Sequence, residues 1–115
     1  LGGSGAHHTY TLSTQAFATV TLGGTAASSV ATASYGALVY VAAIDRFLVR
    51  LGAAGSTVYQ IDPSSFAVTP FATTGGTAIP ATQNGPYNKF LYVPRLGGCV
   101  YVPSYDGNAW FLRLQ

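Results

Sequence analysis

Three aspartates supply every carboxylate side chain of this 115-residue chain, because it contains no glutamate. Hydrolysis of a glycosidic bond needs two carboxyl groups beside that bond. Asp45, Asp62 and Asp106 instead lie in predicted turns, where aspartate is common because its side chain bonds the local backbone. We therefore expect structural aspartates rather than a catalytic pair.

The other residues that could bind a metal or act as a nucleophile are two histidines and one cysteine. His7 and His8 are adjacent, so in a strand their side chains point to opposite faces and do not converge on one metal ion. Cys99 has no second cysteine for a disulfide within the chain, and it suits a small buried position. No phosphate-binding loop or nucleophile elbow is present. The sequence predicts no catalytic residue, no metal site and no cofactor, and we expect that the chain is not an enzyme.

Composition excludes several classes of protein. Charged residues are only 7% and the net charge is +2, with no basic run that would favour nucleic acid as a partner. No stretch approaches the roughly 18 apolar residues that a membrane-spanning helix requires. Hydrophobic residues make up 49%, which is too many for a disordered chain. Low charge with abundant Ser, Thr and Tyr is typical of β proteins outside the cytoplasm, so we expect an extracellular or cell-surface location.

The apolar segments are short, rich in β-branched and aromatic residues, and interrupted by Gly or Pro, which is typical of strands. The run 26–33 is rich in Ala and Ser but has no large residue to bury, so we expect no helix there. The sequence therefore predicts an all-β fold. Its nine predicted strands lie at 9–12, 17–22, 37–42, 46–51, 57–61, 67–72, 89–93, 99–103 and 109–114.

The sequence resembles itself when it is displaced by 52 positions. The matched positions include Gly23-Gly24 with Gly75-Gly76, Tyr35 with Tyr87, Tyr40-Val41 with Tyr92-Val93 and Val58-Tyr59 with Trp110-Phe111. A partial copy precedes these at an offset of 49, in which Tyr10 matches Tyr59 and Phe17 matches Phe66. The change from 49 to 52 implies a three-residue insertion near 71–74.

A repeat of about 50 residues with four short strands has the size of one blade of a β-propeller. The spacing of Gly52, Gly55, Tyr59 and Phe66 resembles a kelch repeat. The segment 44–49 resembles the turn and second strand that precede the glycine pair of a kelch repeat. The segments 87–94 and 110–114 resemble the last blade of bacterial kelch-like propellers. The resemblance implies blades that are antiparallel four-stranded meanders.

Strand counting divides the chain into unequal parts: a flexible lead-in at 1–8, the end of a preceding blade with its connection at 9–34, a complete blade with its connection at 35–86, and the first three strands of a final blade at 87–115. This amounts to about two and a quarter blades, whereas closed propellers have roughly four to eight. Three arrangements remain open. Missing chain could complete the propeller, copies of the chain could complete a ring or filament, or the nine strands could close as a sandwich.

Aromatic and cationic side chains around the funnel of a propeller suit sugars or peptides as ligands. The candidate ligand-binding residues are Tyr35, Tyr87, Lys89, Arg95 and Tyr105. The repeated tyrosines among them have a second interpretation, which is packing between blades, and we expect that packing role for Tyr59, Phe66 and Trp110. We expect three arginines on solvated strand faces or in pairs across blades: Arg46, Arg50 and Arg113.

These patterns together predict a non-enzymatic β-propeller binding scaffold that recognises a protein or a glycan. The alternative is a structural subunit that assembles with copies of itself, through open β edges, into a ring or a filament. A third possibility is an enzyme that uses residues from blades outside this chain.

Overall fold

The computed structural model describes residues 6–75, 78–82 and 84–114, and within them the chain is an all-β protein built from three antiparallel sheets. Most of the predicted lead-in, 1–5, lies outside the described residues, and so does Gly76, which belongs to the Gly75-Gly76 match of the internal repeat. The fold class expected from the sequence is confirmed.

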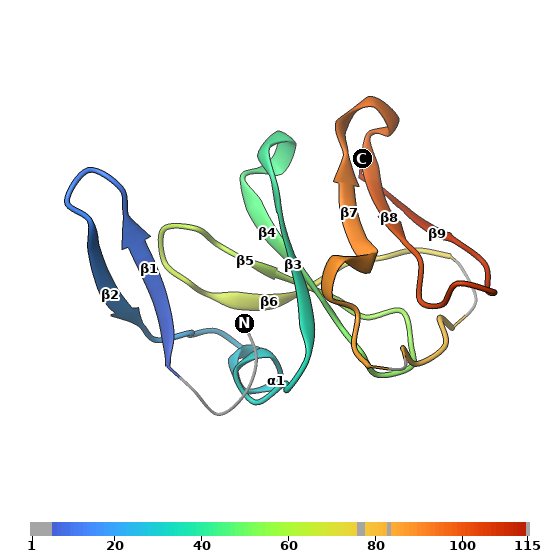
Figure 1. The fold of residues 1–115 in the computed structure, drawn as a ribbon, viewed down its shortest axis with the longest axis horizontal. Coiled ribbons are helices and arrows are strands. Elements are labelled where there is room, and N and C mark those ends of the chain that lie inside the picture. Colours follow the sequence, from blue (N-terminus) through green and yellow to red (C-terminus); the bar gives the residue numbers. More distant parts are fainter. Residues whose placement is uncertain (1–5, 76–77, 83, 115) are drawn as a thin grey trace.

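The central sheet is a meander of four strands in chain order (Figure 1). These are β3 (Gly36–Val41), β4 (Arg46–Leu51), β5 (Val58–Ile61) and β6 (Val68–Phe71). The neighbouring residues Leu48 and Val49 of β4 are both fully buried, although adjacent side chains of a strand point to opposite faces. Both faces of the central sheet are therefore covered at β4.

A two-stranded hairpin precedes the central sheet and a three-stranded sheet follows it. The hairpin consists of β1 (His7–Thr11) and β2 (Ala16–Val20), and the last sheet of β7 (Phe90–Val93), β8 (Gly98–Tyr101) and β9 (Trp110–Arg113). All nine predicted strands are present, and all except β4 have shifted ends. The predicted lead-in of 1–8 is too long, because β1 already begins at His7.

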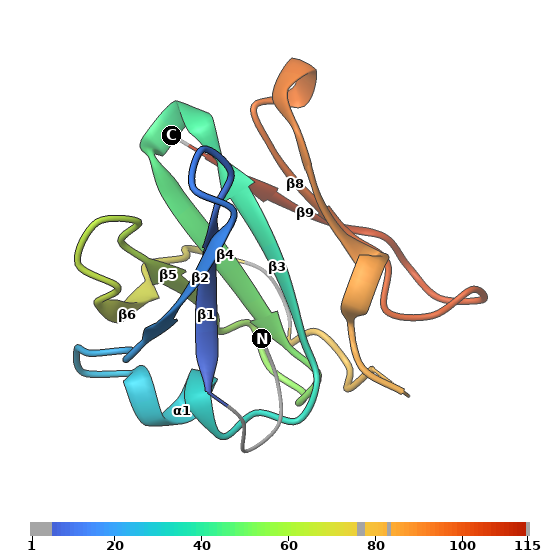
Figure 2. The same cartoon turned by 60° about the vertical axis from the view of Figure 1, so that its left-hand side comes forward.

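The three sheets stand side by side and do not close into a barrel within the described residues (Figures 1 and 2). A sandwich would divide the strands between two facing sheets. The sandwich alternative is therefore wrong, since hydrogen bonding separates the strands into groups of two, four and three.

Two clusters of buried side chains hold the sheets in place. The inter-sheet core lies between the central and last sheets and contains Ala37, Val41, Leu48, Val58, Phe90, Cys99 and Tyr101. The helix-side core lies on the opposite face of the central sheet and contains Ala26, Val30, Val49, Ile61 and Val68. The hairpin β1–β2 contributes no buried residue to either cluster.

A short helix, α1 (Ala27–Ala31), packs beside β6, so the expectation of no helix in 26–33 is wrong. Its single anchor is Val30, which is 1% exposed and which fills the helix-side core. The connection before α1 lies along the edge of β6, where Gly23 forms a parallel bridge with Ala67. At Gly24, φ is +88° and a Cβ would lie 2.5 Å from the carbonyl oxygen of Val68, so only glycine allows this close approach.

In the first two strands of the central sheet and of the last sheet, the structure repeats at the same spacing as the sequence. A 3₁₀ turn, η1 (Ala42–Ile44), joins β3 to β4, and the turn η3 (Pro94–Leu96) joins β7 to β8 at positions 52 residues later. Each turn ends on a left-handed residue, Asp45 with φ 49° or Gly97 with φ 63°. The same backbone unit is thus built twice from different side chains.

The registers of the remaining strands correct the predicted alignment. In the central sheet Val49 pairs with Tyr59, and in the last sheet Tyr101 pairs with Trp110. Trp110 is therefore the counterpart of Tyr59, at an offset of 51, and not of Val58. A one-residue shift of this kind moves every side chain of the strand to the other face.

The first copy also follows an offset of 51 rather than 49. The pair Tyr10–Phe17 occupies the place of the pair Ile61–Val68 in its hairpin. The left-handed residue before the second strand is Gln15 in the first hairpin, with φ 52°, and Phe66 in the second, with φ 56°. No insertion near 71–74 is needed, because the match of β1 and β2 to β5 and β6 has the same offset as the match of β5 to β9.

Candidate functional site

Tyr35 and Tyr87 form an exposed aromatic pair at one end of the central and last sheets. Their ring centroids are 5.7 Å apart and their planes make an angle of 67°, which is an edge-to-face contact. The two residues are 55% and 52% exposed. Half of each ring therefore remains available to a ligand.

The repeat explains why these two tyrosines meet. Tyr35 directly precedes β3, and Tyr87 opens the 3₁₀ helix η2 (Tyr87–Lys89) that leads into β7. Since β3 and β7 are neighbours, equivalent positions before the two strands come together. Gly85 completes the arrangement, because its φ is +80° and a Cβ there would lie 2.6 Å from the Cβ of Tyr35.

The tyrosine pair borders a hollow of about 680 Å³. We call it the tyrosine hollow, and its polar lining residues are Ser29, Ser34, Thr82 and Asn84 together with Tyr35 and Tyr87. The remaining lining residues are small or aliphatic, and the lining contains no acidic or basic side chain. The site offers hydroxyl and amide groups beside two ring faces and carries no charge.

The other three candidate binding residues lie outside the tyrosine hollow. Lys89 ends η2, and its Nζ donates to the carbonyl oxygen of Pro103 at 3.4 Å. Tyr105 is 100% exposed in the loop between β8 and β9, and Arg95 lies exposed in the turn η3. Arg95 therefore follows the far end of β7, away from Tyr87. The structure brings together two of the five predicted residues.

Two of the three aromatics expected to pack between blades lie against the buried clusters. Trp110 packs against the inter-sheet core, and Tyr59 packs against the helix-side core. Phe66 lines a hollow of about 380 Å³ that it shares with His7 and Val20 of the first hairpin.

Arg50 departs from the expectation of a solvated strand face, because it is only 3% exposed. It follows the alternative of pairing across sheets, since its guanidinium carbon lies 5.4 Å from the ring centroid of Tyr101 in β8. Sequence reasoning gave this residue no role of its own. The available signal was the repeat, in which Val102 occupies the equivalent position.

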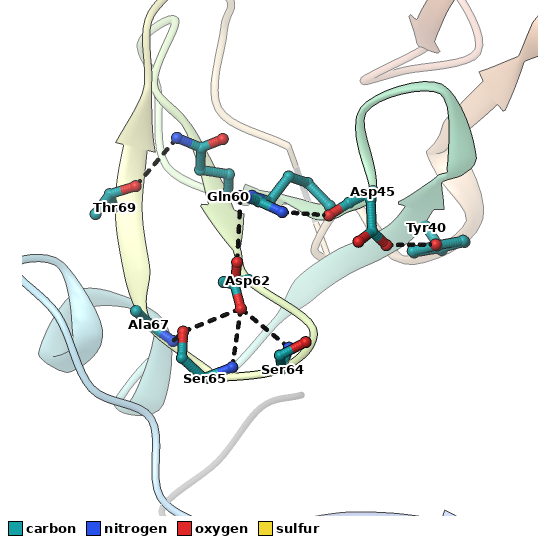
Figure 3. A network of polar contacts seen from close by, with 9 residues as sticks. Tyr40, Asp45, Gln60, Asp62, Ser64, Ser65, Ala67 and Thr69 are labelled. Carbon is teal, nitrogen blue, oxygen red and sulfur yellow. Dashed lines mark hydrogen bonds and ion pairs between the residues drawn. The ribbon is translucent and has the colours of Figure 1, made fainter.

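Two of the three aspartates have the structural roles expected of them (Figure 3). The Oδ1 of Asp62 accepts hydrogen bonds from the backbone N–H groups of Ser64 and Ser65 at 3.0 and 2.8 Å. These bonds hold the pKa of Asp62 below 3.8, and an ion pair with Arg46 at 3.2 Å acts in the same direction. Asp45 accepts a hydrogen bond from the hydroxyl of Tyr40, which raises the pKa of that phenol.

The remaining chemically reactive residues are dispersed. Cys99 is fully buried, and burial raises the pKa of its thiol to about 11, so it stays protonated at neutral pH. Within the ranges 6–75, 78–82 and 84–114, no group of three or more His, Cys, Asp or Glu side chains could hold a metal ion. No helix in the described part of the chain is long and apolar enough to cross a membrane.

A scan against protein-family models, a search of curated proteins and a search of solved structures each find no match to this chain. The similarity to kelch repeats therefore stays a prediction from the sequence.

Proposed function

We propose that this chain is a non-enzymatic binding scaffold of the β-propeller type, whose ligand site is the tyrosine hollow. Its ligand is a protein segment or a glycan met outside the cytoplasm. Three observations support the proposal: sheets that stand side by side, a structural repeat, and loops that gather at the ends of the sheets.

The observation that carries the proposal is the half-exposed pair Tyr35–Tyr87 beside a neutral hollow. Aromatic rings with nearby hydroxyl and amide groups suit the apolar faces and hydroxyls of a sugar, and they also suit an extended peptide. Because the two rings already contact each other, less conformational entropy is lost when a ligand orders them.

Glycan and peptide arrays probed with the whole chain test the proposal. We expect binding to a restricted set of ligands, which Tyr35→Ala and Tyr87→Ala each weaken by about tenfold or more, since each loses one ring face of roughly 1.5 kcal/mol. Arg95→Ala is the matched control, because it changes an exposed side chain at the other end of β7. Equal binding by all four proteins would exclude the tyrosine hollow as the site.

Self-assembly is the second candidate function, and the first hairpin favours it. Leu12 and Phe17 are 83% and 75% exposed, although they are large apolar side chains at the tip and on the strand of this hairpin. Among the described residues β9 pairs with β8 alone, so its outer edge presents free backbone groups. A β edge of one copy could therefore pair with the hairpin of the next.

Sedimentation equilibrium of the purified chain separates the two candidates. Self-assembly predicts a mass that rises with concentration, and it predicts that Phe17→Asp returns the chain to a monomer because a charge replaces an exposed ring. The proposed binding scaffold is compatible with a monomer. A single mass of 11.9 kDa at all concentrations would contradict self-assembly.

A further inference from the structure

Arg50 is a buried cation for which the described residues provide no anion. Its side chain is 3% exposed, and no ion pair forms between it and any described carboxylate. The carboxylate of Asp45 accepts a hydrogen bond from Tyr40. The carboxylate of Asp62 pairs with Arg46 and accepts hydrogen bonds from the 64–65 turn. Burying a charge without an opposite charge is costly, so the site calls for a further partner.

The guanidinium is held by backbone carbonyls, while its Nε atom has no partner among the described residues. Its Nη2 donates to the carbonyl oxygens of Ala53 and Gly55 at 2.9 and 2.7 Å, and its Nη1 donates to that of Thr57 at 3.4 Å. These bonds come from the loop between β4 and β5 and fix the plane of the guanidinium. The Nε–H of Arg50 is buried and has no partner within the described residues.

A second unpaired donor belongs to another residue that lines the same cavity as Arg50. The cavity lies between the central and last sheets, has a volume of about 160 Å³, and is lined by both Arg50 and Trp110. The indole Nε1–H of Trp110 is also buried and without a partner among the described residues. Hydroxyl groups of Ser56, Thr73 and Thr74 line the cavity as well.

The chemistry of this lining selects an anion. Burial lowers the pKa of Arg50 from its ordinary value, but a guanidinium remains charged at neutral pH. The thiol of Cys99, which also lines the cavity, is protonated and supplies no negative charge. Two N–H donors and a positive charge match the oxygens of a carboxylate, which only accept hydrogen bonds.

We propose that the cavity between the central and last sheets is a carboxylate-binding site, in which Arg50 Nε–H and Trp110 Nε1–H donate to the carboxylate oxygens. This site is distinct from the tyrosine hollow and does not depend on its function. The repeat agrees with a specific role for Arg50, because the equivalent position of the last sheet carries Val102 and therefore no charge. The carboxylate comes either from a small free anion or from an acidic side chain of another polypeptide.

The single tryptophan of the chain makes the test direct, since ¹⁵N-labelled protein gives one indole N–H signal. The protein is titrated with sodium acetate, and separately with acetamide at the same ionic strength. We expect a saturable shift of the Trp110 signal with acetate and a response about tenfold weaker with acetamide, which has the same shape but no charge. The Arg50 Nε–H signal should shift together with the indole signal.

A second titration identifies the source of the carboxylate. It uses a blocked tetrapeptide with one Asp and its counterpart with Asn. Saturation by acetate assigns the site to a small free anion, and saturation by the Asp peptide alone assigns it to a polypeptide side chain. If neither acetate nor the Asp peptide gives a saturable shift, the two donors are merely hydrated and the proposal is wrong.

Two variants complete the design. Arg50→Gln should abolish the saturable shift, whereas Arg95→Gln, which removes an exposed cation outside the cavity, should leave it intact. If Arg50→Gln fails to fold, Trp110→Phe replaces it, with the Arg50 Nε–H signal as the reporter and a weakened shift as the expected result. An unchanged acetate response in a folded variant of either residue would also overturn the proposal.

Discussion

Asp62 shows how a single side chain stabilises a turn of this chain. Asp62 accepts three hydrogen bonds from Ser64 and Ser65 through one carboxylate oxygen, counting the Ser65 hydroxyl at 3.0 Å. The other oxygen pairs with Arg46. An aspartate that could have been catalytic thus organises the turn between β5 and β6.

This arrangement predicts a specific pH dependence of stability. The folded-state pKa of Asp62 is depressed below 3.8, so its contribution is fully present above that value and is lost as the pH falls through the folded-state pKa. Urea unfolding between about pH 6 and pH 2 should show a smaller acid-induced loss in Asp62→Asn than in the unmodified chain. Ser65→Ala, which keeps both backbone donors, should fall between them. Identical pH profiles for Asp62→Asn and the unmodified chain would refute this role.

Gly85 makes the tyrosine hollow possible. Gly85→Ala places a Cβ at φ +80° and 2.6 Å from the Cβ of Tyr35, so we expect a loss of about 1–3 kcal/mol in unfolding free energy. Ligand binding should weaken as well, because the tyrosine pair must separate. Thermal denaturation measures the first effect. Gly75→Ala is the control, since it has a similar φ of +74° but no atom within 4 Å of the added Cβ; equal losses in both variants would exclude the contact with Tyr35.

Among the elements, α1 shows where local sequence patterns stop being informative. Periodicity could not reveal a five-residue helix whose only large residue is Val30. The helix forms because that residue fills a gap beside β6, which is a tertiary effect. By contrast, the strands were predictable, since each is a β-branched or aromatic segment between Gly, Pro or Asp turns.

The anchor of α1 can be tested by truncation. Val30→Ala should lower the unfolding free energy by roughly 1–3 kcal/mol, because a fully buried side chain leaves a cavity. Val102→Ala provides the control at a position that is 38% exposed. We expect chemical denaturation to show a clearly larger loss for the first variant. A loss for Val30→Ala no larger than for Val102→Ala would mean that α1 is not anchored by this residue.

The repeat was predictable from residue types, but its register was not. Matching Val58-Tyr59 to Trp110-Phe111 follows similarity of side chains, whereas hairpin pairing equates Tyr59 with Trp110. Loop length sets this register, and a loop shorter by one residue changes which face each side chain occupies. The same limit applied to Arg50, whose burial depends on loop carbonyls that no sequence pattern identifies.

At the scale of the whole molecule, the sheets cover one another only partly. The inner strand β4 is buried on both faces, at Leu48 and Val49. Exposed apolar side chains remain on β3, where Leu38 and Tyr40 are each 46% exposed, and in the last sheet, where Leu91 and Phe111 are 56% and 49% exposed. This gradient agrees with repeated units that need neighbours on each side. Repetition also explains the candidate site, since Tyr35 and Tyr87 are equivalent residues of adjacent units.

The contact between Tyr35 and Tyr87 tests the account most directly, because it requires the repeat, the side-by-side packing of β3 and β7, and an assembled tyrosine hollow at once. Nuclear Overhauser effects between the aromatic protons of the two residues measure it in solution. With ring centroids 5.7 Å apart, we expect clear cross-peaks between the two rings. If the assigned rings show no cross-peaks to each other, and contact different residues instead, the repeated units do not pack as described and the tyrosine hollow does not exist.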